Sequence, residues 1–483
     1  MPSLPHHNFR IYEPKIMNQF LAAIAFLLLI FAASCFAQND MTAKVDKFVK
    51  DEMQKQKIPG VSLAVLRDGQ IVYAKGYGLA NVEHQVPVKP ETIFQSGSIG
   101  KQFTATAVMI LVEEGKISLD DKINKYFTDA PESWKNIAVR HLLTHTSGMG
   151  DYPKDFDYRA DYTEDEFYKK IKAAPLAFQP GENWDYSNMG YVTLGILINK
   201  VSGKFYGDFL QERVFKPLGM TTARIINEDD IIPNRAAGYM LVKGELKNQQ
   251  WVSPSVNTTA DGALYLTVYD MAKWDAALYG EKLLKKTTLE QMWTPVKLNN
   301  GKTHPYGFGW GLGEANGKRI IEHGGAWQGF KSFIVRYPDE KLTVVIFANL
   351  IEASEEKLAR GVAAIYSPAV ALPALSSIED KEPKVTAFVK EVLQKTVDGT
   401  VSRELFTPEA ATALFPDRNK QAGDFLKSLG TFVDLQLVER TEQGEVRLYR
   451  YRVTYRNYQD NVLLLTVGLT KDDKIAGIQI QPE

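Results

Sequence analysis

Cysteine is nearly absent from this chain: its 483 residues include only Cys35. A single cysteine cannot form a disulfide within the chain, so disulfides do not hold the fold. An excess of either charge is absent too, because 57 basic and 58 acidic residues leave a formal net charge of −1. We therefore expect neither nucleic acid nor a strongly acidic partner. The Gly-x-Ser-x-Gly elbow typical of α/β-hydrolases is also missing, as are internal repeats.

Charge is missing altogether from residues 20–33, FLAAIAFLLLIFAA. Arg10 and Lys15 precede this apolar run and small residues follow it in ASCFAQ, which is the layout of a secretory signal. The run is short for a membrane-spanning helix. We predict a signal peptide over residues 1–37, cleavage after Ala37, and a periplasmic or secreted protein.

Two alternatives stay open at this end of the chain. The ASC sequence resembles a bacterial lipoprotein processing site, which would make Cys35 a lipidated anchor, although Ala32 stands where leucine is usual. Translation could also start at Met17 rather than at Met1.

Alternating apolar residues at both ends of the region 38–365 predict one mixed α/β (α+β) domain. Residues 61–78 read as two strands with a hairpin turn at Asp68-Gly69, and helical, loop-rich sequence follows residue 98. A sheet built from both ends with helices between them is an α/β layout. The strands expected at the C-terminal end are 319–324, 331–337 and 342–349.

Three prolines and a serine pair in residues 366–384 predict a linker. Beyond it, residues 385–483 predict a small α+β domain without a titratable cluster that suggests chemistry. Tyr449, Tyr451, Val453 and Tyr455 should share one strand face with Arg447. We expect helices over 385–396 and 418–429, and three strands near 432–440, 445–457 and 461–480.

The stretch SGSIGKQFTA, residues 96–105, places Ser98 three residues before Lys101 at the start of a predicted helix. Positions i and i+3 lie on one helix face, so the lysine can reach the serine. A hydroxyl is a poor nucleophile until a base takes its proton, and a buried lysine can serve as that base. The same spacing recurs at Ser354 and Lys357 in a strongly charged stretch, where a solvated helix start is the simpler interpretation.

A Tyr-x-Asn pair, Tyr186 and Asn188, follows a Pro-Gly turn in PGENWDYSNMGY. A tyrosine can relay protons, and an asparagine amide can hydrogen-bond a substrate. Tyr455 and Asn457 repeat this spacing in a predicted strand, where i and i+2 share a face for structural reasons.

The third element is His323-Gly324-Gly325, at the end of a predicted strand. Paired glycines let a substrate approach the backbone as an added strand would, and His323 could meet its polar end. The alternative is a strand end at which the glycines merely turn the chain.

These three elements in this order are far more specific than any one of them. On them, the chain from about residue 43 to residue 365 resembles the serine β-lactamase and D-Ala-D-Ala peptidase superfamily, on the side related to class C β-lactamases. The stretches that carry the resemblance are PGVSLAVLRDGQIVYAKGYG, FQSGSIGKQFTA, EEGKISLDDKI, VRHLLTHTSGM, PGENWDYSNMGYVTLG, DGALYLTVYDMAKW and HGGAWQGF.

The resemblance implies a β-lactamase/transpeptidase-like sheet flanked by helices and acyl-enzyme chemistry without a metal or organic cofactor. Ser98 would be the acylated nucleophile, Lys101 its partner base and Tyr186 the proton relay. The oxyanion hole would consist of the backbone N–H groups of Ser98 and Ala326. The implied substrate-binding residues are Asn188, His323, Gly325 and Ala326.

The third motif departs from the Lys-Thr-Gly or Lys-Ser-Gly that is usual in β-lactamases. A lysine supplies a permanent cation for a substrate carboxylate, whereas a histidine with an ordinary pKa of about 6.5 is mostly neutral at pH 7. We therefore expect weak β-lactamase activity. A zinc site at His141 and His145, four residues apart, is not predicted because no third ligand is apparent.

The sequence thus predicts an exported serine hydrolase that forms an acyl-enzyme on Ser98. Its partners would be small molecules or peptides: short peptides, D-amino acid peptides of the peptidoglycan type, or small esters. Two alternatives remain, a catalytically weak β-lactamase and an inactive homologue that binds cell-wall peptides.

Overall fold

The computed structural model describes residues 40–482 except 154, 372–374, 444–445 and 457–462. It divides into two compact units with the boundary between residues 371 and 372. The predicted signal peptide and Cys35 lie outside the described residues. In the part of the chain that is described, no helix is long and apolar enough to cross a membrane.

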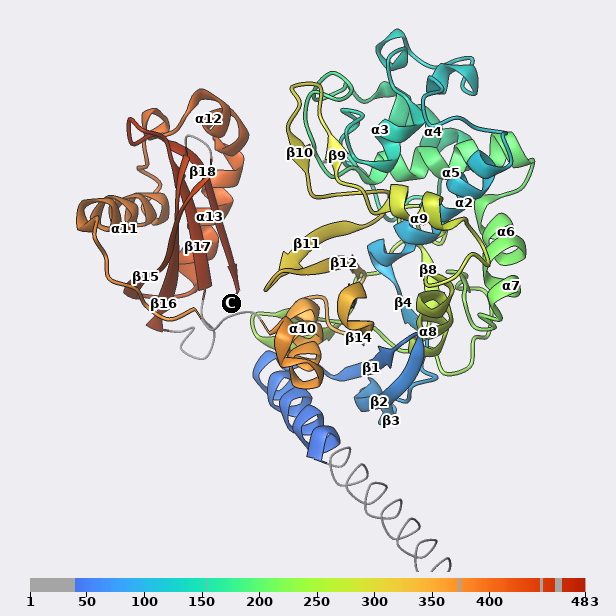
Figure 1. Cartoon of the computed structure of the whole chain (residues 1–483), viewed down its shortest axis with the longest axis horizontal. Helices are drawn as coiled ribbons and strands as arrows, with labels where there is room; N and C mark the ends of the chain where they lie inside the picture. Colours follow the sequence, from blue (N-terminus) through green and yellow to red (C-terminus); the bar gives the residue numbers. More distant parts are fainter. Residues whose placement is uncertain (1–39, 154, 372–374, 444–445, 457–462, 483) are drawn as a thin grey trace, which may run out of the picture. The chain divides into compact units, whose positions relative to one another are not determined.

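Unit 1, which ends at residue 371, is built on a seven-stranded antiparallel sheet (Figure 1). Its order, β11-β12-β13-β14-β1-β2-β3, pairs the first strand of the chain with the last strand of the unit, as expected from the sequence. The strands are β1 (Gly60–Arg67), β2 (Gln70–Asn81), β3 (Val86–Pro87), β11 (Gly311–Ala315), β12 (Lys318–Trp327), β13 (Phe330–Tyr337) and β14 (Leu342–Ala348).

The hairpin between β1 and β2 confirms the turn predicted from Asp68-Gly69. Both residues have positive φ, 52° and 69°. Two consecutive positive φ angles are what a two-residue turn of type I′ requires, and aspartate and glycine tolerate them best.

Alternate residues of the central strands pack on opposite faces of the sheet. On β14, Val345 and Phe347 belong to one core, and Val344, Ile346 and Ala348 belong to the other. The second core includes residues of a helix over 40–56 and of α10 (Glu355–Tyr366). The first contains α2 (Lys101–Glu113), α5 (Asn188–Ser202) and α8 (Val268–Ala277). The strands are therefore buried on both sides, which explains their continuous apolar runs.

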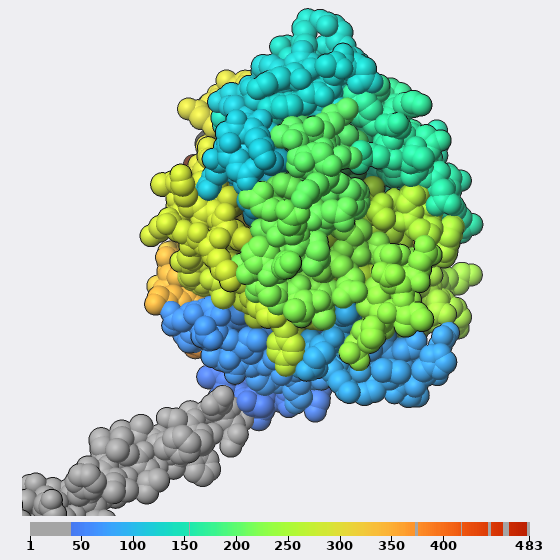
Figure 2. All heavy atoms as spheres, turned by 90° about the vertical axis from the view of Figure 1, so that its right-hand side faces the viewer, coloured from blue at the N-terminus to red at the C-terminus, as the bar shows by residue number. Residues whose placement is uncertain are grey.

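The segment between β3 and β11 combines helices, short strands and loops. It makes up most of the side of unit 1 that faces the viewer in Figure 2, above a lower band of blue residues, with α5, α6 and α7 in green near its centre. Its other helices are α3 (Val139–Leu143), α4 (Glu164–Ala173), α6 (Tyr206–Leu210), α7 (Lys216–Leu218) and α9 (Lys286–Met292). Its short strands are β4 (Phe94–Gln95), β5 (Arg224–Ile225), β6 (Tyr239–Val242), β7 (Glu245–Asn248), β8 (Leu264–Leu266), β9 (Val296–Lys297) and β10 (Thr303–His304).

Unit 2 is a four-stranded antiparallel sheet with helices, in agreement with the predicted α+β class. Tyr449, Tyr451, Val453 and Tyr455 are buried in its core, which confirms the predicted strand face. The elements are α11 (Pro383–Val397), α12 (Pro408–Leu414), α13 (Asp417–Ser428), β15 (Phe432–Gln443), β16 (Val446–Tyr455), β17 (Leu463–Leu469) and β18 (Ile475–Pro482).

The prediction of one long third strand near 461–480 is wrong. The segment forms β17 and β18, joined by a turn in which Thr470 N–H donates to Lys474 O at 2.9 Å and Asp473 has a φ of 60°. Thr470-Lys-Asp-Asp-Lys is typical turn chemistry, since aspartate tolerates positive φ.

Candidate active site

Ser98 lies in a short 3₁₀ turn, η1 (Gly97–Gly100), between strand β4 and helix α2. Its side chain is partly exposed. Two flanking glycines let this turn contact other backbones: a Cβ on Gly97 would lie 2.5 Å from Ala326 N, and one on Gly100 would lie 2.8 Å from Gly262 Cα. Gly97 also has a φ of 52°. Only glycine allows both the close backbone contact and the positive φ at position 97, so Gly97 lets the turn with Ser98 lie directly against β12.

Lys101 is the first residue of α2 and is completely buried. Its Nζ lies 3.1 Å from Ser98 Oγ, 2.7 Å from Asn188 Oδ1 and 2.6 Å from the backbone oxygen of Asp261. The structure thus joins the Ser-x-x-Lys and Tyr-x-Asn motifs through one nitrogen, although 87 residues separate Lys101 from Asn188.

This arrangement suits a lysine that exchanges a proton with the serine. Asn188 Oδ1 and the Asp261 carbonyl can only accept hydrogen bonds, so they hold two N–H groups of Lys101 in either protonation state. The third direction of Nζ points at Ser98 Oγ. A neutral amine would present its lone pair there and accept the serine proton, and an ammonium would donate a proton back.

Asn188 is fixed from both sides of its amide. It begins α5, whose N-cap Ser187 accepts a hydrogen bond from Gly190 N at 2.9 Å. While Oδ1 accepts from Lys101, Nδ2 donates to Asp151 Oδ1 at 3.0 Å. Asn188 therefore positions Lys101, and in this structure its amide is engaged by the protein.

Tyr186 packs against the same lysine, with Lys101 Nζ 4.8 Å from the ring centroid. The Tyr186 ring also packs against the ring of His145, with 4.2 Å between the two ring centroids. The Tyr186 hydroxyl is buried and has no hydrogen-bond partner among the described residues. A buried hydroxyl without a partner is unfavourable unless it serves a purpose, and here it is available to a substrate or to a moving proton.

The backbone of the third motif lies beside Ser98. A Cβ on Gly325 would be 3.0 Å from Ser98 N and 2.1 Å from Ser96 O, so this position must be glycine. Ala326, the next residue of β12, is exposed. The sequence-predicted oxyanion donors, the N–H groups of Ser98 and Ala326, therefore belong to two adjoining backbones.

His323, which the sequence predicts to meet a substrate's polar end, is buried among protein groups. Its Nε2 lies 2.9 Å from the hydroxyl of Tyr306, and its Nδ1 lies 2.6 Å from the backbone oxygen of Gly324. Only 8% of the residue is exposed, and burial lowers its pKa to about 4. Both ring nitrogens are thus engaged inside the protein, and the histidine is neutral well below pH 7.

Two residues of the site, His145 and Tyr306, were not singled out as functional from the sequence. His145 accepts a hydrogen bond at Nδ1 from Ser187 N at 3.0 Å, and its Nε2 lies 3.2 Å from the Tyr306 hydroxyl. Burial, with the charge of Lys101 as a smaller cause, holds the pKa of His145 well below its usual value. From the sequence, the spacing of His141 and His145 pointed only to a zinc site, which we did not predict. Within the described ranges, no group of three or more side chains of the metal-binding types could hold a metal ion.

The second copies of the motifs have structural surroundings. Ser354 is the N-cap of α10, and Lys357 Nζ lies 3.6 Å from Glu52 Oε2 on the helix over 40–56. Tyr455 is buried in the core of unit 2, and Asn457 lies outside the described residues.

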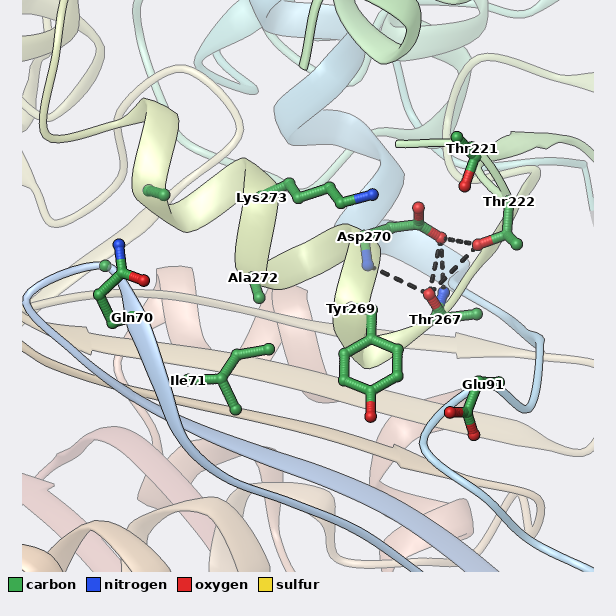
Figure 3. A pocket seen from close by; sticks show the side chains of 12 residues that line it. Gln70, Ile71, Glu91, Thr221, Thr222, Thr267, Tyr269, Asp270, Ala272 and Lys273 are labelled. Atoms are coloured by element: carbon green, nitrogen blue, oxygen red, sulfur yellow. Dashed lines mark hydrogen bonds between the residues drawn. The ribbon is translucent and has the colours of Figure 1, made fainter. Parts of the chain in front are cut away.

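A pocket of about 640 Å³ lies apart from Ser98, between the β1–β2 turn and α8 (Figure 3). Its polar wall is a helix cap: Thr267 is the N-cap of α8, and Asp270 Oδ2 accepts from Thr267 N at 3.1 Å and from the Thr222 hydroxyl. Asp270 is the third residue of the helix, and its carboxylate completes a capping box with Thr267. The hydrogen bonds of this cap thus satisfy the polar groups of that wall within the protein.

The nucleophile, its lysine and the surrounding backbone define a serine hydrolase of the Ser-Lys type. Comparison with known proteins agrees: the model of the family described as Beta-lactamase matches residues 45–366, and the chain belongs to this family. It has the β-lactamase/transpeptidase-like fold, with a further strand-rich unit at the C-terminal end.

Similar sequences include Penicillin-binding protein 4* of Bacillus subtilis (strain 168), 32% identical over 320 residues, or 62% of this chain and 70% of that protein. D-aminopeptidase of Gluconobacter oxydans (strain 621H) is 28% identical over 315 residues, 63% of this chain and 58% of that one.

Two solved structures extend the comparison. The octameric penicillin-binding protein homologue from Pyrococcus abyssi has a TM-score of 0.63 and 27% identity, with 89% of this chain and 90% of that one covered. D-amino acid amidase from Ochrobactrum anthropi SV3, complexed with L-phenylalanine, has a TM-score of 0.60 and 25% identity, with 68% and 99% covered.

Proposed function

We propose that this chain is an exported serine hydrolase that acylates Ser98 and cleaves amide or ester bonds of small substrates, chiefly amides and peptides of D-amino acids. The observation that carries the proposal is Lys101 Nζ, held against Ser98 Oγ by two further acceptors. The similarity to proteins named D-aminopeptidase and D-amino acid amidase supports the substrate class.

In acylation, Ser98 Oγ attacks the substrate carbonyl carbon while its proton passes to neutral Lys101. The negative charge that develops on the carbonyl oxygen would be stabilised by the N–H groups of Ser98 and Ala326. The bond to the leaving nitrogen or oxygen then breaks, and the leaving group takes the proton from Lys101 by way of the Tyr186 hydroxyl. The acyl group remains as an ester on Ser98.

In deacylation, water attacks the ester carbon and gives one proton to the same Lys101–Tyr186 pair. The bond to Ser98 Oγ breaks, Ser98 recovers that proton, and the carboxylic acid leaves. Each proton returns to its starting place, so the cycle needs no cofactor.

The charges around Ser98 favour substrates without a carboxylate next to the scissile bond. Lys101 directs its three hydrogen bonds to protein acceptors and to the nucleophile. The carboxylate of Asp151 lies beside Asn188, and that of Asp261 accepts from Tyr152 at 3.2 Å. These two negative groups would repel a penicillin carboxylate rather than hold it.

A substrate panel on the purified protein tests this function. At pH 7 we expect D-alanine amides and p-nitrophenyl esters to have a higher kcat/KM than nitrocefin, and a fluorophosphonate probe to label the protein. Nitrocefin hydrolysis above that of every ester and amide would make the second candidate, a β-lactamase, the better assignment. Absence of both labelling and turnover would contradict the hydrolase.

Export is a separate part of the proposal and rests on the apolar run with its basic start. Intact mass of the protein from its natural host should place the mature N-terminus near Gln38. A mass that fits acylated Cys35 would show a membrane-anchored lipoprotein instead.

A further inference from the structure

His145, Tyr306 and His323 form one continuous chain of hydrogen bonds next to Ser98. The two histidines are 178 positions apart and come from the loop after α3 and from β12, and Tyr306 precedes β11. The Tyr306 hydroxyl lies 3.2 Å from His145 Nε2 and 2.9 Å from His323 Nε2. A single side chain thus bridges both rings.

Backbone groups at both ends fix the direction of this chain. Ser187 N–H donates to His145 Nδ1, so the proton of the neutral His145 ring is on Nε2 and points at Tyr306. The Gly324 carbonyl can only accept, so His323 carries its proton on Nδ1 and its Nε2 is an acceptor. The Tyr306 hydroxyl accordingly accepts from His145 and donates to His323.

The chain opposes protonation of His323. A second proton on Nε2 would point at an oxygen that already accepts from His145, and the Tyr306 hydroxyl proton would have to turn away from His323 toward its other neighbour, Tyr191. Among the other groups near the ring, the hydrogen bond to the Gly324 carbonyl raises the pKa of His323 and the charge of Lys101 lowers it, while the Tyr186 ring lies 6.2 Å away. Burial is the largest cause.

We propose that Tyr306 is a specificity-determining residue: by occupying Nε2 of His323 and locking it in a chain with His145, it keeps the third motif from presenting a cation or a donor to a substrate carboxylate. This inference rests on the proposed hydrolase function. Beside the repulsion by Asp151 and Asp261, it assigns part of the discrimination against leaving groups that carry a carboxylate to a tyrosine outside the three motifs. Tyr306 acts through His323 and is a positioning residue.

The first test reads the histidine tautomers in the resting protein and needs no turnover. Long-range ¹H–¹⁵N spectra of the full chain labelled with ¹⁵N-histidine should show two buried neutral rings of opposite type. His145 should be protonated on Nε2 and His323 on Nδ1, and both should stay neutral at pH 6. Finding His323 protonated on Nε2, or titrating near pH 6.5, would overturn the proposal whatever the enzyme cleaves.

The second test removes the bridge with Tyr306→Phe. Loss of the donor to Nε2 makes the neutral form of His323 less favourable, so its pKa should rise and the protonated share at pH 5.5 should grow by roughly tenfold. D-alanyl-D-alanine and D-alanyl-D-alaninamide share a scissile bond and differ only in a terminal carboxylate. The carboxylate-to-amide ratio of kcat/KM should therefore rise several-fold at pH 5.5 and stay unchanged at pH 8.5.

Tyr206→Phe is the matched control, because it also removes a buried hydroxyl, one that donates to the Thr259 carbonyl at 2.8 Å, without contact to either histidine. It should leave the substrate ratio unchanged at both pH values. A Tyr306→Phe protein with the wild-type ratio at pH 5.5 would contradict the proposal. If the wild-type protein cleaves neither peptide, the peptide part of the proposed function fails, while the tautomer measurement still decides the role of Tyr306.

Discussion

The Ser-x-x-Lys spacing occurs at two helix starts of unit 1, and the two surroundings differ in almost every physical respect. Lys101 is fully buried and has three oxygen partners, one of them Ser98. Lys357 is 35% exposed and pairs at 3.6 Å with Glu52. Ser354 serves as an N-cap without a side-chain capping bond, and its backbone N–H donates to Gln56 at 2.7 Å. The spacing brings a serine hydroxyl and a lysine amine within reach of each other. Burial of the lysine and the acceptors that converge on it make the pair suitable for proton transfer.

The residues around each copy explain this difference. Gly97 and Gly100 admit the backbones of Ala326 and Gly262, which close the site around Ser98. Acidic residues follow Ser354 in ASEEKLAR, and the charged groups of this copy form ion pairs with other residues, Glu355 with Lys331 and Lys357 with Glu52. A glycine-flanked serine before an apolar helix is therefore a better sign of catalysis than the spacing alone.

The largest expected effect is on covalent labelling. Ser98→Ala removes the attacking oxygen, so fluorophosphonate labelling should disappear, while Ser354→Ala should label like wild type. Peptide mapping of the labelled protein locates the modified serine. A label on the peptide with Ser354 would reverse the assignment.

The next effect concerns the two lysines. Lys101→Ala removes the proton acceptor and leaves Asn188 Oδ1 and the Asp261 carbonyl without their donor, so acylation should slow by roughly 10²–10⁴-fold or more. Lys357→Ala should leave the acylation rate within a factor of about two, since exposed ion pairs contribute little. Stopped-flow acylation by a p-nitrophenyl ester measures both. Equal losses of acylation rate in Lys101→Ala and Lys357→Ala would contradict the assignment of catalysis to the Ser98 copy of the motif.

The parts of the site predicted from sequence are those carried by short contiguous motifs. Ser98 and Lys101 share one turn, and Asn188 stands in a second short motif whose helix start places its amide against Lys101. The strands were predictable where apolar residues alternate, as on β16. The division of β17 from β18 was missed, although the turn residues after Leu469 signalled it.

The other parts depend on long-range packing. The Asp261 carbonyl is a backbone atom, which has no sequence signal. His145 and Tyr306 are 161 residues apart and meet only once the sheet is assembled. The motif predicted that His323 binds the substrate. Its hydrogen-bond partners, Tyr306 and the Gly324 carbonyl, could not be recognised in the sequence. Contacts of this kind need the fold.

The pH dependence of stability extends the comparison, because the buried histidines His145 and His323 lie near Lys101, whereas the contacts of Ser354 and Lys357 described above include none. Burial lowers the pKa of His323 to about 4 and that of His145 well below its usual value; His141, outside the site, also falls to about 4. Below about pH 6.5 these histidines bind protons in the unfolded chain but remain neutral in the folded protein. Stability should therefore fall as the pH drops from 6.5 toward 4.

Each such histidine should cost about 1.4 kcal/mol of unfolding free energy per pH unit in that window. His323→Asn should remove one contribution and make the decline between pH 6 and pH 5 shallower by about that amount, whereas Ser354→Ala should leave the slope unchanged. All seven tryptophans precede residue 372, so urea unfolding followed by tryptophan fluorescence reports on unit 1 alone. The slope is compared rather than the absolute stability, because the substitution also changes packing. An unchanged slope in His323→Asn would show that His323 is already protonated in the folded protein at pH 6, which is incompatible with a Tyr306 hydroxyl that donates to its ring.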